Sequence, residues 1–422
     1  MASRSLPSTS TKDKAKGKTI KLAILDDYAN IAPAYFQRLA SSIKNTDLDL
    51  EIHSFPTTLN ARLPNEHDAL IARLQPFSII SSMRERTQFP RSVLSRLPNL
   101  KLLLTTGAKN AAIDVGACKE LGIRLVGTRA KSGAVPGYDS TNEQTWALIL
   151  GLVRNVVVGD TRLKTTRDGW QTDETDIDTV ADDTDETATD ADIDTDTTAD
   201  AATATATADT NPGNHSNFNP ALVSSLAGKT LGLLGLGRLG TQAAVTGHLG
   251  FGMRVLAWSS NLTQAQADAA ATGRGLPAGT FEVAGSKAEL FRRADVLSIH
   301  YVLSERSRGI VAKSELSVMK PTAVLVNTSR GPLVHEPDLL EALETGAIAA
   351  VGLDVFDTEP LPPDSPWRRP RFWGRGGRSR VLLSPHLGYA EDETMHAWYE
   401  QQVAAVRLWL SGAEITAGVV IV

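Results

Sequence analysis

The feature that most constrains this chain is an alternation of short apolar runs with helical stretches, which begins at Thr19. Before residue 130 the runs lie at 21–25, 78–80, 102–104 and 124–126. After Gly228 they lie at 230–234, 254–258, 296–300, 324–326, 350–354 and 381–383. This alternation is typical of a parallel sheet with helices on both faces, and 422 residues are too many for one core. We therefore predict an α/β protein with two doubly wound parallel-sheet domains.

Residues 172–214 interrupt this pattern with a low-complexity sequence of Asp, Thr and Ala. Residues 172–210 contain fourteen Asp or Glu and no Lys or Arg. Because the segment has almost nothing to bury, it cannot offset the entropy lost on ordering, and we predict a disordered acidic insertion. Without it, the net charge of the chain changes from −5 to +9, a basic body that can attract an anionic ligand.

Composition argues against several classes of protein. The one cationic cluster, at 368–380, lies in a Pro/Gly-rich stretch typical of a solvated loop, so we predict no nucleic-acid partner. No apolar run reaches the roughly 18 residues that span a bilayer, and the N-terminus lacks the apolar segment of a signal peptide. The single cysteine, Cys118, excludes an internal disulfide and a thiolate metal cluster. We predict a cytoplasmic protein with no membrane partner and no metal site.

A glycine motif follows the first apolar run of the second set. Gly235, Gly237 and Gly240 form the pattern G-x-G-x-x-G between an expected strand and an expected helix. The first glycine permits a tight turn, the second lets the backbone approach a pyrophosphate, and the third lets the helix pack on the strand. Amides at the helix start then hold the anion. Alone the motif is weak, but in this context it predicts a dinucleotide cofactor, NAD or NADP.

The residue expected to bind the ribose departs from this motif. An Asp or Glu is expected about 20 residues further on, but Ser259 stands nineteen residues after Gly240, followed by Ser260 and Asn261. A carboxylate there would repel a ribose 2′-phosphate, so its absence makes NADP admissible. No arginine occupies those three positions, although Arg274 in a later loop is a candidate. The choice between NAD and NADP stays open.

Three polar residues follow later strands of the second set: Arg330, Glu359 and His386. Because the carboxyl ends of the strands in a doubly wound sheet meet at the cofactor crevice, we expect these residues to converge there. The planar guanidinium of Arg330 can bind two carboxylate oxygens at once. Histidine is the natural proton donor near neutral pH, and a glutamate beside it favours the protonated ring. His300 closes a strand without an acidic partner in view, and we interpret it as structural.

Together these motifs resemble the D-isomer-specific 2-hydroxyacid dehydrogenases, which include glyoxylate/hydroxypyruvate reductases and phosphoglycerate dehydrogenases. The resemblance covers residues 20–411 apart from the acidic insertion. It rests on GLLGLGRLG at 232–240, NTSRGPLVHEPDLLEAL at 327–343, GLDVFDTEP at 352–360 and SPHLG at 384–388. It implies an NAD(P)-dependent oxidoreductase that transfers hydride between nicotinamide and a small 2-keto or 2-hydroxy acid of D configuration.

The resemblance also implies a domain arrangement. A flavodoxin-like substrate domain is expected from 19–133 and 387–422, and a Rossmann-like NAD(P)-binding domain at 134–386 is inserted into it. Two further segments of the chain are expected to be disordered. One is a tail at 1–18, and the other is the acidic insertion at 172–214, which lies within the cofactor domain near the family's dimer arm. Family members are usually homodimers through the cofactor domain, so we expect a homodimer.

The family's functional positions fall on particular residues of this chain. Arg330 is expected to bind the substrate carboxylate, His386 to act as acid and base, and Glu359 to be its hydrogen-bonded partner. Asp354 matches the position that meets the nicotinamide carboxamide, and Thr106 and Gly107 match the loop whose amides hold the other side of the carboxylate. The expected catalytic residues are Arg330, Glu359 and His386; the cofactor-binding residues are Gly235, Gly237, Arg238, Leu239, Gly240, Ser259, Thr328, Asp354, His386 and Gly388; and the substrate-binding residues are Thr106, Gly107 and Arg330.

Two other functions stay open. Some relatives with this fold act as corepressors that bind nicotinamide and recruit partners, so the alternative is a nicotinamide-sensing binding protein with the acidic insertion as its interaction segment. Formate dehydrogenation is a weaker alternative, because relatives with that activity carry an amide where Glu359 stands. The sequence identifies no particular keto acid.

Overall fold

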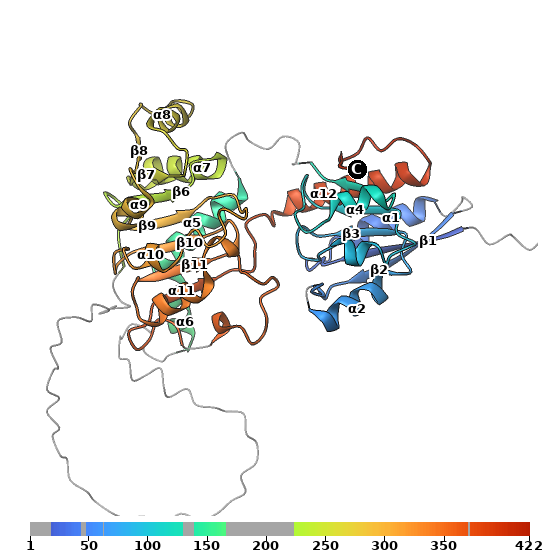
Figure 1. The fold of residues 1–422 in the computed structure, drawn as a ribbon, viewed down its shortest axis with the longest axis horizontal. Coiled ribbons are helices and arrows are strands. Elements are labelled where there is room, and N and C mark those ends of the chain that lie inside the picture. The colour runs from blue at the N-terminus through green and yellow to red at the C-terminus, as the bar shows by residue number, and fades with distance from the viewer. Residues whose placement is uncertain (1–17, 44–47, 62, 130–138, 166–222, 370–371) are drawn as a thin grey trace, which may run out of the picture. The chain divides into compact units, whose positions relative to one another are not determined.

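The computed structural model describes residues 18–43, 48–61, 63–129, 139–165, 223–369 and 372–422. It divides into two compact units (Figure 1): unit 1 comprises Met1–Pro136 and Ala390–Val422, and unit 2 comprises Gly137–Tyr389. The predicted acidic insertion lies outside the described residues. So does the predicted tail, except that Lys18 is the first residue of a strand and was wrongly placed in the tail.

Unit 1 is built on a six-stranded sheet. Its strands are β1 (Lys18–Leu25), β2 (Leu48–Phe55), β3 (Ile79–Ser82), β4 (Leu102–Thr105), β5 (Arg124–Gly127) and β13 (Val419–Val420). Its helices are α1 (Ala32–Ile43), α2 (Pro64–Leu74), α3 (Arg91–Leu94), α4 (Val115–Glu120) and α12 (Asp392–Leu410). The strand order is β13-β5-β4-β3-β1-β2, and all neighbours are parallel except β13, which is antiparallel to β5. The order β2-β1-β3-β4-β5 is that of the flavodoxin-like doubly wound sheet.

The strands of unit 1 are buried because helices cover both faces. All four residues of β3 and of β4 are buried, as expected for parallel strands between two helical layers. On one face, Leu70, Ile71 and Leu74 of α2 join the core cluster. The C-terminal helix α12 also packs on this unit: Ser81 of β3 donates a hydrogen bond to Gln402 of α12 at 2.6 Å. The end of the chain thus completes the unit that its beginning starts.

Unit 2 is built on a seven-stranded parallel sheet. Its strands are β6 (Thr230–Leu234), β7 (Arg254–Trp258), β8 (Phe281–Val283), β9 (Val296–Ile299), β10 (Val324–Asn327), β11 (Ala350–Leu353) and β12 (Arg380–Leu383). Its α-helices are α5 (Ser140–Val153), α6 (Val156–Thr165), α7 (Arg238–Val245), α8 (Gln264–Thr272), α9 (Lys287–Arg293), α10 (Lys313–Leu316) and α11 (Glu336–Glu344), and short turns of other helix types lie at Thr246–Gly250, Gly331–Leu333 and Pro366–Arg368. The strand order is β12-β11-β10-β9-β6-β7-β8. The order reverses between β6 and β9, the switch point at which doubly wound sheets bind their ligands.

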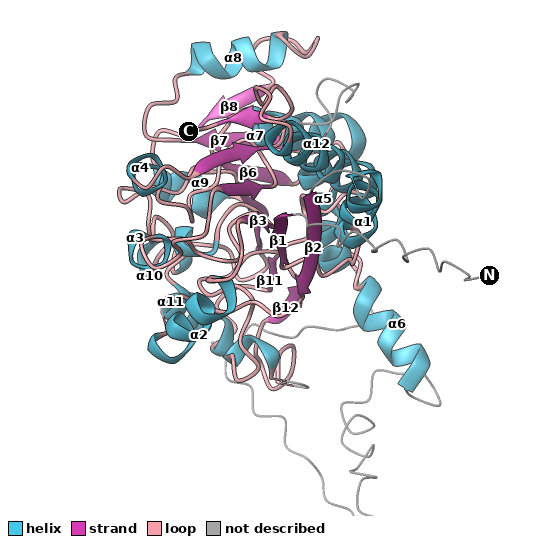
Figure 2. Ribbon diagram, turned by 90° about the vertical axis from the view of Figure 1, so that its right-hand side faces the viewer, coloured by secondary structure: helices cyan, strands magenta, loops and turns pink. Residues whose placement is uncertain are grey.

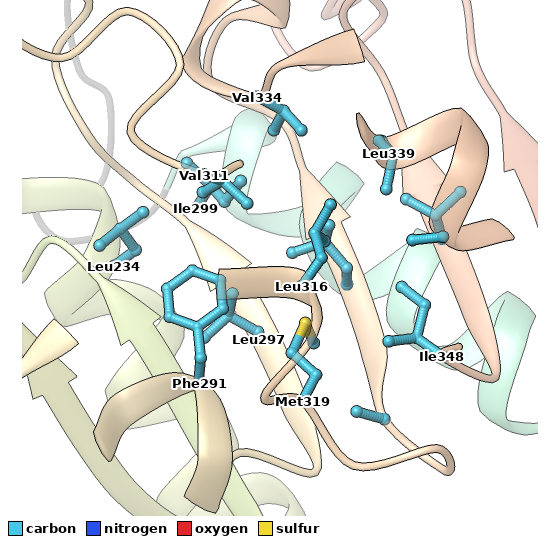
Figure 3. Close-up of a cluster of buried hydrophobic side chains, with 14 of the residues drawn as sticks. Leu234, Phe291, Leu297, Ile299, Val311, Leu316, Met319, Val334, Leu339 and Ile348 are labelled. Atoms are coloured by element: carbon cyan, nitrogen blue, oxygen red, sulfur yellow. The ribbon is translucent and has the colours of Figure 1, made fainter. Parts of the chain in front are cut away.

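Two apolar layers sandwich the sheet of unit 2. One cluster joins Leu297 and Leu325 of the sheet to Phe291 of α9 and Leu339 of α11, and Figure 3 shows many of its side chains together. The other cluster joins the opposite strand faces to Trp146 and Ile149 of α5 and to residues of α7 and α8. Figure 2 shows α8 beyond the edge strand β8. These two layers leave the ends of the strands as the places where polar side chains can gather.

The predicted fold class is confirmed, with local differences. The predicted runs became strands whose ends differ from the prediction by at most three residues, whereas β2, β8 and β13 were not predicted. Within the described residues, none of the helices combines the length and apolar character needed to cross a membrane.

Candidate active site

The glycine motif forms the turn between β6 and α7. Gly235 has a φ of 101°, which favours glycine, and a Cβ there would lie 2.5 Å from the carbonyl oxygen of His300. A Cβ on Gly240 would overlap the carbonyl oxygen of Gly235. In contrast, a Cβ on Gly237 would meet no atom within 4 Å, and Gly237 is the N-cap of α7. The turn is therefore tight on its inner side and open on its outer side, which fits a pyrophosphate held by the first amides of the helix.

Arg238 and Leu239 are the first two residues of α7. The Arg238 guanidinium lies 2.6 Å from a carboxylate oxygen of Asp139, the N-cap of α5, and its side chain is 65% exposed. Leu239 is partly buried. Arg238, a predicted cofactor-binding residue, therefore places a cation at the rim of the glycine turn. An anionic ligand bound there would compete with Asp139 for this guanidinium.

The end of β7 carries Ser259, which is partly exposed, and Ser260, which is exposed. The Ser260 hydroxyl lies 3.0 Å from the hydroxyl of Tyr301, which follows β9. Arg274 follows the far end of α8, whose nine residues span roughly 13 Å at 1.5 Å per residue. Positions 259 and 260 therefore carry hydroxyl groups, and neither position carries a carboxylate or a guanidinium.

Arg330 stands in a well-anchored loop at the carboxyl end of β10. The Asn327 side chain donates to the carbonyl oxygen of Arg330 at 2.9 Å and accepts from the amide of Ser329 at 3.0 Å. The Ser329 hydroxyl donates to the carbonyl oxygen of Ile299 at 2.7 Å, which ties the loop to β9. The guanidinium of Arg330 is partly buried and donates to the carbonyl oxygen of Ser329 at 2.7 Å. The loop thus fixes the arginine backbone before any ligand binds.

Gly331 brings the Arg330 loop against the loop that carries Glu359. A Cβ on Gly331 would overlap the carbonyl group of Phe356, and it would lie 2.5 Å from the amide nitrogen of Asp357. A second connection is the amide of Asp354, which donates to the carbonyl oxygen of Asn327 at 3.0 Å. Only glycine permits this close approach of two backbones.

His386 and Glu359, which the sequence separates by a long loop, form a hydrogen-bonded pair. Nδ1 of His386 lies 2.6 Å from Oε2 of Glu359. Oε1 of Glu359 accepts from the amide of Phe356 at 2.9 Å, which fixes the carboxylate from its other side. The two side chains are 16% and 26% exposed, so the pair is largely shielded while keeping access to solvent. With Nδ1 engaged, Nε2 is the ring nitrogen left to exchange a proton with a substrate.

Asp354 holds the loop that presents His386. Its carboxylate accepts three hydrogen bonds, from the Ser384 hydroxyl at 2.5 Å and from the amides of Leu387 at 2.8 Å and Gly388 at 2.9 Å. Burial raises the pKa of Asp354, and these three donors oppose the rise. His386 has a φ of 56°, the left-handed conformation that side chains rarely adopt. The hydrogen bonds that Asp354 accepts from residues before and after His386 stabilise this strained backbone.

Thr328 and Gly388, two further predicted cofactor residues, are held inside unit 2. The Thr328 hydroxyl lies 2.7 Å from the hydroxyl of Thr145 in α5. The carbonyl oxygen of Gly388 accepts from the hydroxyls of Ser140 and Thr141 at 2.9 and 3.0 Å. These described contacts connect the carboxyl edge of the sheet to the start of α5.

The predicted carboxylate loop lies in unit 1, after β4. Thr106 is fully buried, and its hydroxyl accepts from the amide of Arg84 at 2.9 Å. Gly107 has a φ of 87°, and its amide donates to the Thr128 hydroxyl at 2.6 Å, so this amide is already engaged. A Cβ on Gly107 would lie 2.6 Å from Nη1 of Arg84. Arg84, which the sequence reasoning missed, thus places a cation against this loop; its position directly after the β3 segment was the available signal.

His300 lies beneath the glycine turn, as a structural residue should. Its Nε2 lies 2.9 Å from the Ser298 hydroxyl, and its Nδ1 is buried without a hydrogen-bond partner. The residue keeps partial exposure through other atoms. Burial lowers the pKa of His300 to about 4, so the ring is neutral at neutral pH.

Comparison with known proteins agrees with this geometry. Residues 200–388 match the family described as D-isomer specific 2-hydroxyacid dehydrogenase, NAD binding domain. A glyoxylate reductase of Aeropyrum pernix is 31% identical over 312 residues, which are 72% of this chain and 71% of that protein. The chain belongs to the D-isomer specific 2-hydroxyacid dehydrogenase family. The predictions of family, of an NAD(P)-dependent dehydrogenase and of the cofactor class are thereby confirmed.

Two further members of the family illustrate the range of similarity. A glyoxylate/hydroxypyruvate reductase B of Enterobacter sp. is 36% identical over 170 residues, 40% of this chain and 47% of that protein, so this match spans about half of the relative. The crystal structure of a phosphoglycerate oxidoreductase from Vibrio cholerae O395 has a TM-score of 0.66 and 28% identity, and covers 93% of this chain and 100% of its own. The structural similarity therefore extends over both units, whereas the higher sequence identity of 36% is limited to part of the chain.

The contact at Gly331 generates a prediction about stability. Replacing Gly331 by Ala should force the two loops apart, at a cost of roughly 1–3 kcal/mol, which corresponds to a Tm lower by roughly 2–12 °C for a domain of this size. Thermal unfolding measures this decrease in Tm, and turnover should fall as well. Gly250→Ala is the control, because a Cβ there meets only a methyl group at 4.0 Å. Equal Tm values for the two variants would contradict the close contact.

The buried ring of His300 generates a prediction about pH. The pKa of His300 in the folded state, about 4, lies below its ordinary value of 6.5. Between these values the unfolded chain binds the proton more readily, so His300 lowers stability as pH falls from 6.5 toward 4. Denaturant unfolding of His300→Gln should therefore show a weaker loss over this range than the unmodified chain. The control is His248→Gln, at a ring that contacts the carbonyl oxygen of Met253 and has no carboxylate partner among its described contacts, and this variant should keep the original pH dependence.

Proposed function

We propose that the protein transfers hydride between a nicotinamide cofactor and a small 2-keto or 2-hydroxy acid of D configuration. The observation that carries this proposal is the hydrogen bond between His386 and Glu359 at 2.6 Å. The pair lies in the unit that holds the glycine turn, at strand ends shared with Arg330. An acid/base pair, a carboxylate-binding cation and a dinucleotide turn in one unit are the parts that this reaction needs.

His386 is the proton donor in the direction of reduction. A reduced nicotinamide, when bound, would supply the hydride. The carbonyl oxygen of the substrate gains negative charge as hydride arrives, and Nε2 of the protonated ring donates its proton to that oxygen. Glu359 accepts from Nδ1, which orients the ring and stabilises its positive charge. In the oxidation direction the neutral ring takes the hydroxyl proton back.

Arg330 binds the substrate carboxylate through its planar fork. In unit 1, Thr106 and Gly107 stay predicted substrate-binding residues, and the Gly107 amide donates to the Thr128 hydroxyl. Arg84, close to Gly107, adds positive potential to this turn. Fixing the carboxylate orients the carbonyl carbon for hydride and so supplies much of the rate.

The substrate class is narrowed by relatives named glyoxylate reductase and glyoxylate/hydroxypyruvate reductase. We propose a small 2-keto acid of this kind, identified by following nicotinamide absorbance with a panel of 2-keto acids and both reduced cofactors. These relatives do not favour the nicotinamide-sensing alternative. The homodimer stays a prediction, which sedimentation analysis tests.

The acid/base assignment predicts a separation of turnover from binding. His386→Asn should lower kcat by roughly 10²- to 10⁴-fold, the usual contribution of a general acid. The Kd for the cofactor, measured by quenching of tryptophan fluorescence, should change little. His248→Asn is the control, because this histidine follows α7 and bonds to the carbonyl oxygen of Met253. Retained turnover in His386→Asn would refute the assignment.

The neutral residues after β7 predict tolerance of both cofactors. Ser259→Asp should weaken NADPH binding about tenfold or more, since a carboxylate there faces the 2′-phosphate, while NADH binding is kept or improved. The ratio of the two Kd values, from the same fluorescence titration, measures the change. Asn261→Asp adds the same charge two residues further on and should change the ratio less. An unchanged ratio in Ser259→Asp would show that this position does not face the ribose.

A further inference from the structure

Gln144 of α5 reaches the loop that carries His386. Its Nε2 donates to the Ser384 hydroxyl at 2.9 Å, across a separation of 240 residues in the sequence. Ser384 is the first residue after β12, and both side chains are partly buried. The reaction proposed above gives Gln144 no role, although only the Ser384 hydroxyl separates its amide from the Asp354 carboxylate.

The hydrogen bonds from Gln144 through Ser384 to Asp354, here called the amide relay, have one direction. Oγ of Ser384 lies 2.5 Å from Oδ1 of Asp354, and the two carboxylate oxygens also accept from the amides of Leu387 and Gly388. Three donors suit an ionised carboxylate, which only accepts, so the hydroxyl proton of Ser384 points to Asp354. The hydroxyl oxygen then has only lone pairs left for Gln144. Gln144 must therefore present its amide NH₂ group, and not its carbonyl oxygen, to Ser384.

Ser384 connects the amide relay to His386 directly. Its carbonyl oxygen accepts from the amide of His386 at 3.0 Å, while its hydroxyl binds Asp354. A change in the orientation of Ser384 therefore reaches the backbone of His386. Because His386 holds a strained φ of 56°, freeing Ser384 would let this backbone relax and would turn the ring away from Glu359.

Helix α5 gives the amide relay a rigid anchor. Gln144 and Thr145 lie three and four residues after Thr141, so the three side chains share one face of the helix. Thr141 donates to the carbonyl oxygen of Gly388, and the Thr145 hydroxyl lies 2.7 Å from that of Thr328. Apolar residues of α5 belong to the core of unit 2. The helix thus contacts the site loops at three points and has little freedom to move.

We propose that Gln144 is a positioning residue for the proton transfer by His386. Its amide fixes the Ser384 hydroxyl as a donor to Asp354, and Asp354 in turn holds the backbone on both sides of His386. Gln144 acts only through Ser384, so it is not itself a catalytic residue. The proposal rests on the proposed function, since it assigns Gln144 a part in the same reaction.

The ionisation of Asp354 should depend on the amide relay. Burial raises the pKa of Asp354, and the Ser384 hydroxyl is foremost among the groups that lower it, followed by the amides of Leu387 and Gly388 and by the charge of His386. A weaker bond from Ser384 should let the pKa of Asp354 rise further. As the solution is acidified, Asp354 then takes up its proton at a higher pH and releases the loop there.

The remaining described groups around Asp354 are neutral or form their described bonds elsewhere. The neutral groups on α5 and at the end of β10 are Thr141, Gln144 and the carbonyl oxygen of Asn327. Two charged side chains stand in the neighbouring loops: Arg330 donates to the carbonyl oxygen of Ser329, and Glu359 pairs with His386. The ionisation of Asp354 should therefore respond mainly to the donor that Gln144 orients.

The pH dependence of kcat in Gln144→Leu tests the proposal. Leucine keeps the approximate size of the side chain and removes the donor. As the solution is acidified, kcat for reduction of a 2-keto acid should begin to fall at a pH higher by roughly 0.5–1 unit than in the unmodified chain. At about pH 6 this kcat should be roughly 2- to 10-fold lower, whereas at about pH 8 the two values should agree. The KM for the keto acid should change little, because Arg330 lies outside the amide relay.

Matched variants separate positioning from packing. Gln144→Glu keeps the shape, but an ionised carboxylate accepts the Ser384 proton and withdraws it from Asp354, so kcat should fall further than in Gln144→Leu. Ser384→Thr keeps the hydroxyl and should retain the pH profile that Ser384→Ala loses. Gln264→Leu is the control, because it removes an amide donor to the carbonyl oxygen of Phe281 at 2.8 Å. This variant should lower Tm without moving the pH profile.

Titration of the Asp354 carboxyl measures the effect without turnover. With ¹³C in the aspartate side chains, the Asp354 resonance is assigned by its loss in Asp354→Asn, and it should titrate at a higher pH in Gln144→Leu than in the unmodified chain. An unmodified chain that reduces no 2-keto acid would refute the proposed function, and this titration would still decide whether Gln144 orients Ser384.

Two results overturn the proposal. One is a pH profile and a carboxyl titration of Gln144→Leu that superimpose on those of the unmodified chain. The other is an equal loss of kcat at every pH, which would give Gln144 a merely structural role. If Gln144→Leu does not fold, the isosteric Gln144→Glu carries the same two measurements, and an unchanged profile there overturns the proposal equally.

Discussion

The buried carboxylate of Asp354 is the interaction on which the candidate site depends. It lies at the carboxyl end of β11 and binds three donors of the segment 384–388. A buried carboxylate without donors would be costly, and His386 in a left-handed conformation would be costly on its own. Each stabilises the other, so the imidazole is presented to Glu359 by a loop that has little freedom to adopt another shape.

The rest of the site follows from the topology of the sheet. Parallel strands β6, β9, β10, β11 and β12 end on one edge, and each end contributes one part: the glycine turn, the ring of His300 beneath it, Arg330, Asp354 and His386. Asn327 and Gly331 then join the loops of β10 and β11 into one assembly. Residues distant in sequence become neighbours because the hydrogen-bonded ladder sets the strand ends side by side.

The sequence predicted the parts of this arrangement that follow from the spacing of apolar residues and of glycines. Continuous apolar runs predicted the parallel strands, and the glycine spacing predicted the turn after β6. The edge strand β2 was missed because its sequence LDLEIHSF alternates apolar and polar residues and lacks the continuous apolar run on which the prediction relied, and β8 has only three residues. The pairing of His386 with Glu359 was expected from the family, but its support by Asp354 and by the Phe356 amide was not. Such bonds depend on loop conformation, which side-chain type alone does not specify. For the same reason the contact of Arg84 with Gly107 was not foreseen.

The two edges of the sheet in unit 2 differ in the sequence changes that they can accept. Its carboxyl edge carries interlocked loops in which one added methyl group at Gly331 has no room. Its amino edge receives two long connections, one before β6 and one before β12. A laboratory seeking to fuse a reporter or to graft a binding peptide onto this scaffold should use the amino edge, where the chain already enters β6 and β12 through long connections.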